Sequence, residues 1–94
     1  MKKAAYKVKG GKMIRVSIRE SWGKIREIKI TGDFFLHPEE LIEELEEVLV
    51  GKPLNAQDLA RFIKRLMQCR DATLLGASPE DFAKCILMAG GRAG

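Results

Sequence analysis

Few residues of this sequence have the type and spacing that catalysis or cofactor binding requires. Gly10-Gly11-Lys12 is the only candidate for a phosphate-binding loop. It lacks the spacing and the following Ser or Thr of a P-loop, and it precedes a predicted strand instead of a helix. We interpret it as a flexible turn, or as a loop whose glycines let the backbone approach a phosphate or a partner. By itself it is not a nucleotide site.

The remaining polar candidates favour structural roles. Asp33 lies between Gly32 and two phenylalanines, and it is either a functional carboxylate or a turn residue whose side chain binds backbone amides two residues further on, of which the turn is favoured. His37 has no second histidine within metal-ligand spacing and lies beside a predicted helix start, so capping or solvent exposure outweighs catalysis, and no metal site is proposed. The serines do not form a nucleophile elbow or a Ser, His and Asp arrangement. We therefore predict no catalytic residue in this chain.

Charge is distributed unevenly along the chain. Residues 1–32 carry ten basic and two acidic side chains, residues 33–50 carry seven acidic and no basic ones, and residues 51–94 carry seven basic and four acidic ones. Clustered charge of this kind orients an incoming partner.

Two binding interpretations follow from the charge. The first is a small nucleic-acid-binding module, because the predicted hairpin carries five basic residues that would neutralise phosphates: Arg15, Arg19, Lys24, Arg26 and Lys29. The aromatic support is poor, since only Tyr6 and Trp22 lie near this segment. The second is a structural domain that pairs with a basic partner through Glu43 and Glu47, although a glutamate-rich helix is more often just a solvated face.

Length and composition indicate one domain over residues 1–94, with an ordered core at about 6–89. No window reaches 18 apolar residues and the lysine-rich start is not a signal sequence, so we expect a cytoplasmic protein without a membrane segment. Cys69 and Cys85 fall at helical positions outside any CxxC motif. We expect both to be buried free thiols in a reducing compartment.

Alternating apolar residues predict two strands, at 13–19 and 25–31, joined by a turn at residues 21–24. We expect a register with Ile14 opposite Ile30 and Val16 opposite Ile28, because it buries all four side chains together. Ile25 is out of phase with this pattern, and a bulge or the hairpin end is expected to absorb it. The opposite face of the hairpin remains positively charged.

A third short extended segment is expected after Gly32, with Phe34 or Phe35 filling the core. Pro38 is expected to open a helix at its first position, where the missing N–H costs nothing. An apolar stripe continues this helix until Gly51 ends it.

Two further helices are predicted. Asn55 is the expected cap of a helix at 56–69, and Ser78 followed by Pro79 begins the last helix. Strands followed by helices imply an α+β fold, with an antiparallel sheet of about three strands followed by three helices packed on one face.

Several short motifs occur together and in order. They are Lys7 to Lys12, Gly32 to Phe35, the Pro38-Glu39-Glu40 helix start, Leu49-Val50-Gly51, and Leu75 to Asp81. With this combination the chain resembles the accessory domain of lipoate-protein ligase over nearly its whole length, from about Tyr6 to Ala89. Lys9 stands where a proline is expected before the glycine pair.

The resemblance implies a non-catalytic accessory subunit of a two-chain ligase, made as a separate small protein. Its partner, the catalytic subunit, would hold ATP, lipoate and magnesium and form lipoyl-adenylate, so this chain would bind no cofactor alone. Lipoyl-domain acceptor proteins would be involved only indirectly. The loop of Gly10, Gly11 and Lys12 would approach the partner or its active site, and the segment of Asp33, Phe34 and Phe35 is a second candidate interface.

Overall fold

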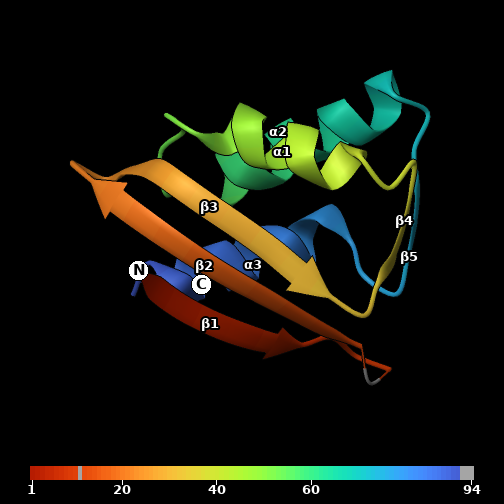
Figure 1. Ribbon diagram of the computed structural model, residues 1–94, viewed down its shortest axis with the longest axis horizontal. Helices are drawn as coiled ribbons and strands as arrows, with labels where there is room; N and C mark the ends of the chain where they lie inside the picture. Colours follow the sequence, from red (N-terminus) through yellow and green to blue (C-terminus); the bar gives the residue numbers. More distant parts are fainter. Residues whose placement is uncertain (11, 92–94) are drawn as a thin grey trace.

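The alternating segments of the first third of the chain form a three-stranded antiparallel sheet in the order β1-β2-β3 (Figure 1). Its strands are β1 (Lys2–Lys7), β2 (Met13–Ser21) and β3 (Lys24–Gly32). The computed structural model describes residues 1–10 and 12–91. The expected α+β fold is confirmed.

The register of the β2–β3 hairpin differs from the prediction by two residues. Val16 lies opposite Ile30 and Ile18 opposite Ile28. Ser21 pairs with Lys24 across a tight two-residue turn, and a bulge beside Arg19 adds one residue to β3; the turn and the bulge together set the register. Because the shift is an even number of residues, the same side chains still face the core. The expected bulge is present.

Strand β1 is absent from the sequence-based prediction, which places the start of the ordered core at about residue 6. The strand begins at Lys2 and pairs along its whole length with β2. Its alternation is weak, because only Ala4 and Tyr6 pack against the core. Lysines are common on edge strands, where their charge discourages pairing with other molecules.

The short extended segment after Gly32 is confirmed, but it does not extend the main sheet. It forms β4 (Phe35–His37), which pairs with β5 (Thr73–Leu75) in a separate two-stranded sheet. The expected third strand of the main sheet is instead β1. A strand of three residues has little local signal, so its partner is decided by the packing of the whole domain.

The three helices are α1 (Leu41–Leu49), α2 (Ala56–Cys69) and α3 (Pro79–Ala89). The prediction that α1 opens at Pro38 is wrong, because Leu41 N donates to Pro38 O at 3.1 Å and residues 38–40 form a turn before the helix. The other two starts are confirmed: Asn55 caps α2, and α3 has the capping box in which Ser78 and Asp81 exchange hydrogen bonds.

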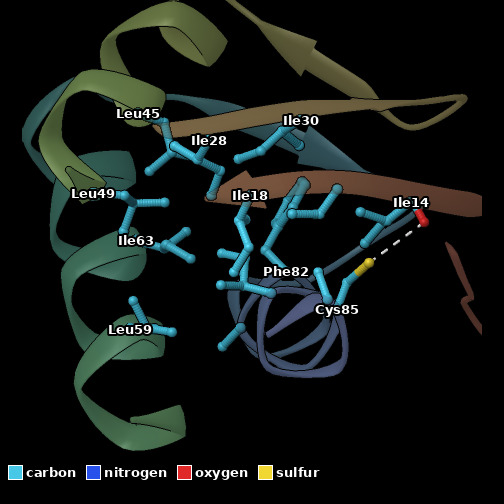
Figure 2. Packing of buried hydrophobic residues seen from close by; sticks show 14 of the residues in the cluster. Ile14, Ile18, Ile28, Ile30, Leu45, Leu49, Leu59, Ile63, Phe82 and Cys85 are labelled. Atoms are coloured by element: carbon cyan, nitrogen blue, oxygen red, sulfur yellow. Dashed lines mark hydrogen bonds between the residues drawn. The ribbon is translucent and has the colours of Figure 1, made fainter. Parts of the chain in front are cut away.

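All three helices cover one face of the main sheet (Figure 1), with α3 on β1 and β2 and α1 beside β3. Between these layers the core contains Phe82, Ile18 and Leu45, all fully buried (Figure 2). Cys85 is buried as expected, and its thiol lies 3.5 Å from the Ile14 carbonyl oxygen. Burial raises the pKa of Cys85 to about 11. The expected burial of Cys69 is wrong, because this residue is exposed at the end of α2.

Candidate functional site

Three segments that are distant in the sequence meet at one end of the molecule, on the right in Figure 1. They are the β1–β2 loop, the residues between β3 and β4, and the connection from β5 to α3. We call this region the loop end and define it by Gly10, Lys12, Asp33, Phe34, Phe35, Leu75 and Gly76. Both segments that the family resemblance makes candidate interfaces belong to it, apart from Gly11, which lies outside the described residues.

Asp33 joins two of these segments. Its carboxylate accepts a hydrogen bond from Met13 N at 2.6 Å, and its own N–H donates to Met13 O at 3.2 Å. The Met13 N–H is the main reason that the pKa of Asp33 lies below its ordinary value, with smaller contributions from the nearby Lys12 and Arg15 charges. Asp33 therefore has a structural role, but not the expected one in a local turn: its carboxylate binds the backbone amide of Met13, 20 positions away in the sequence, and fixes the start of β2 behind the glycine–lysine loop.

The two phenylalanines have opposite roles. Phe34 packs edge-on against Phe82 of α3, with ring centroids 4.9 Å apart and an interplanar angle of 88°. The expectation that one of the pair fills the core is thus confirmed for Phe34. Phe35 instead keeps 52% of its surface exposed. A glycine is needed before this segment, because a Cβ at Gly32 would lie 2.8 Å from the Phe34 ring and would also collide with the Met13 carbonyl oxygen.

Phe35 is part of an exposed apolar pair. It lies directly opposite Leu75 across the β4–β5 ladder, and Leu75 is 60% exposed. A shallow hollow of about 330 Å³ lies on the Phe35 side of the pair and is lined by Phe35 together with Gly32, Phe34 and Glu39, among others. Contiguous exposed apolar side chains beside a hollow are typical of protein-binding sites. The sequence analysis did not single out Leu75 as an interface residue; the one available signal was its apolar character in a connector.

The connection from β5 to α3 leaves room for the Lys12 side chain. A Cβ at Gly76 would lie 3.0 Å from Lys12 Cγ, so the lysine stem passes over a glycine that leaves room for it. Val8 N donates to Lys12 O at 2.7 Å and closes the β1–β2 turn, in which Gly10 has φ 105°. The loop end therefore holds the exposed Lys12 side chain over Gly76, the residue that follows Leu75 in the sequence.

The aromatic rings near the basic segment lie away from the exposed sheet surface. Tyr6 faces the helix layer, where Lys84 Nζ lies 4.9 Å from its ring centroid. Trp22 is 91% exposed, but it lies at the tip of the β2–β3 hairpin, at the end of the molecule opposite the loop end. The cationic sheet surface thus gains no stacking platform from these rings, which weakens the nucleic-acid interpretation.

Some of the glutamates of α1 contact neighbouring elements of the fold. Glu46 accepts a hydrogen bond from Ile30 N on β3 at 2.7 Å, and Glu44 pairs with Arg70. Glu43 and Glu47 remain exposed. Two of the four glutamates of this helix thus bind neighbouring elements and are not part of a fully solvated face.

Within residues 1–10 and 12–91, no cluster of His, Cys, Asp and Glu side chains is arranged to hold a metal ion. A search of the same residues for a helix of sufficient length and hydropathy to cross a bilayer also finds none.

The fold and the loop end define a small α+β domain with a candidate protein-binding end. Residues 2–86 match the family model described as the bacterial lipoate protein ligase C-terminus, and the chain belongs to this family. It is 33% identical over 82 residues to "Lipoate-protein ligase A subunit 2" of Thermoplasma acidophilum, an alignment that covers 86% of this chain and 82% of the relative.

The fold is also similar to a solved structure. The TM-score is 0.77 and the identity 30%, and the match covers 89% of this chain and 91% of the other. That work describes an archaeal lipoylation system from Thermoplasma acidophilum, comprising a bipartite lipoate protein ligase and its E2 lipoyl domain. The family resemblance seen in the sequence motifs is confirmed.

Proposed function

We propose that this chain is the non-catalytic accessory subunit of a two-chain lipoate-protein ligase and that its loop end docks onto the catalytic subunit. The catalytic subunit would bind ATP, lipoate and magnesium and activate lipoate to lipoyl-adenylate, and the lipoyl group would then pass to a lysine of a lipoyl-domain protein. The family membership and the bipartite relative support the assignment. We also propose a cytoplasmic location, which the free cysteines support.

The observation that carries the docking proposal is the exposed pair of Phe35 and Leu75 beside the Lys12 loop. Large apolar side chains at the centre of an interface supply most of its free energy, because docking removes them from water. The hydrogen bonds between Asp33 and Met13 hold the surrounding backbone in place. A preorganised surface loses less conformational entropy on association.

Lys12 is the residue that we expect to act on the partner's reaction. An ammonium group brought next to a phosphate stabilises the charge that develops during adenylation, and closure of a domain over the pocket excludes water from the mixed anhydride. This role requires only that the Lys12 side chain reach the pocket from outside. It assigns no nucleophile or proton transfer to this chain.

Lipoate-dependent pyrophosphate release tests the assignment. We expect no release from this chain alone, weak or no release from the catalytic subunit alone, and full activity when the two are mixed. An equally active catalytic subunit in the absence of this chain would show that the assignment is wrong.

Replacement of Lys12 by Ala tests the contribution of the loop. A charged hydrogen bond is worth about 1.5–3 kcal/mol, so we expect adenylation to slow by about 10- to 100-fold. Transfer from preformed lipoyl-adenylate should slow much less. Lys9→Ala, in the same turn, is the matched control and should leave both steps unchanged. Equal slowing of both steps by Lys12→Ala would indicate a docking role instead.

A further inference from the structure

The face of the main sheet opposite the helices is not covered by any described element (Figure 1). We call it the open face. Side chains alternate across a strand, so the strand registers identify the residues that share it. Between the β1–β2 loop and the bulge beside Arg19 they are Lys3, Ala5 and Lys7 of β1, Met13, Arg15, Ser17 and Arg19 of β2, and Glu27, Lys29 and Thr31 of β3. Ser21 and Lys24 lie beyond the bulge at the hairpin tip, and we do not include them in the open face.

The open face is strongly cationic. It carries five basic residues and a single carboxylate, Glu27, which pairs with Arg19 at 2.9 Å. Among the described residues, the other four basic side chains form no salt bridge: Lys3, Lys7, Arg15 and Lys29. Arg15 lies near the Asp33 carboxylate and Lys29 borders a hollow lined by glutamates of α1, but no salt bridge within the described part of the chain holds either side chain, so all four charges are available to an incoming anionic surface.

The strand registers place the basic residues around a patch of short side chains. Lys3, Ser17 and Lys29 form one row across the three strands, and Arg15 lies between Ala5 and Thr31 in the next row. A shallow hollow of about 390 Å³ lies over these rows. Because alanine, serine and threonine are short, a carboxylate side chain has room to enter between the cations.

The open face differs in kind from the loop end. It has no exposed large apolar side chain among the described residues, whereas the loop end exposes Phe35 and Leu75. Permanent interfaces need an apolar centre, while charged surfaces without one mainly accelerate encounter and give weaker, short-lived complexes. The open face is therefore suited to a partner that binds and leaves in every catalytic cycle. It also lacks an aromatic ring on which a nucleobase would stack, which favours a protein partner over a nucleic acid.

We propose that the open face recruits the acceptor: it binds a carboxylate-rich surface of the lipoyl domain whose lysine is to be modified. This inference rests on the proposed function, and it adds a direct contact between this chain and the acceptor. The catalytic subunit occupies the loop end, and the acceptor is drawn to the neighbouring sheet surface by electrostatic attraction.

The double variant Arg15→Glu/Lys29→Glu tests the proposal in the assembled two-chain ligase. Its matched control is Arg61→Glu/Lys64→Glu, which reverses the same number of exposed charges on α2, in the helix layer. The substrate is the apo lipoyl domain encoded by the same organism. Two rates are measured separately: lipoate-dependent pyrophosphate release without acceptor, and transfer from preformed lipoyl-adenylate as a function of acceptor concentration.

We expect the open-face variant to raise KM for the lipoyl domain about tenfold at low ionic strength and to leave pyrophosphate release unchanged. The effect should shrink to about twofold as salt screens the charges. The neutral variant Arg15→Gln/Lys29→Gln should give an intermediate KM. It removes the same charges without adding carboxylates, so it still tests the proposal if the reversed-charge variant does not fold. The α2 control should keep the wild-type KM.

Three outcomes would overturn the inference. The first is an unchanged KM with normal pyrophosphate release, which would leave the proposed function intact. The second is equal loss of pyrophosphate release and transfer, which would assign the open face to the catalytic subunit. The third is that the wild-type ligase binds a single-stranded DNA 20-mer in a salt-sensitive manner and that the double variant abolishes this binding without changing KM for the acceptor. That result would make the open face a nucleic-acid site. Absence of any activation by the wild-type chain would instead refute the proposed function.

Discussion

Truncation of Phe35 to Ala isolates the contribution of the exposed apolar pair to assembly. A phenylalanine buries about 150–250 Å² when fully covered, and 52% of this side chain is exposed in the isolated chain. Docking would therefore remove about 100 Å² from water, which at about 25 cal/mol per Å² is worth about 2.5 kcal/mol. Because Ala retains the Cβ, we expect a loss of about 2 kcal/mol, which is about a 30-fold increase in Kd.

Titration calorimetry of the two subunits measures this change. The already buried part of Phe35 supports β4, so the variant is also expected to lose about 1–2 kcal/mol of folding stability. Circular dichroism must confirm that it is folded at the titration temperature. Trp22→Ala is the matched control, because it removes an even more exposed aromatic ring at the opposite end of the molecule, and its Kd should stay at the wild-type value.

The two variants separate the possible interfaces. A folded Phe35→Ala protein whose Kd rises less than about threefold would show that the pair is not at the centre of the interface. A large effect of Trp22→Ala would move the interface to the hairpin tip.

Three further predictions concern the fold around the loop end and the hairpin. Gly32→Ala should cost about 2–4 kcal/mol in urea denaturation, because its Cβ meets the Met13 carbonyl and the Phe34 ring; a loss below about 0.5 kcal/mol would show that the backbone relaxes. Because the pKa of Asp33 is depressed in the folded state, the ionised carboxylate stabilises the fold above the unfolded Asp pKa of about 3.9. This stabilisation disappears as the pH falls through the lower folded pKa. The difference in free energy of unfolding between wild type and Asp33→Asn should therefore narrow below about pH 4. Trp22 has φ 58° and Gly23 has φ 73°, which is the conformation of a type I′ turn, and Asn-Gly is preferred there because Asn tolerates a positive φ. Trp22→Asn should therefore raise the free energy of unfolding by about 0.5–1 kcal/mol and Tm by a few degrees. An unchanged or lower Tm in calorimetry would contradict this.

The sequence determines the elements whose signals are local. Asn55 and Ser78 carry the side-chain oxygens that satisfy the first amides of α2 and α3, so both helix starts follow from neighbouring residues. The alternation in β2 and β3 decides which side chains face the core, and the phase of Ile25 predicts the bulge. The motifs that carry the family resemblance are likewise short and contiguous, so they are visible before the fold is known.

The candidate site required the tertiary structure. Only the folded chain brings Lys12 onto Gly76 and pairs Phe35 with Leu75, because these residues are distant in sequence and no local preference selects their partners. The same applies to β1, whose lysine-rich sequence becomes a strand because β2 offers it a free edge. Short-range hydrogen bonding thus fixes helix ends and strand faces, whereas the contacts that assemble the loop end depend on how the whole domain packs.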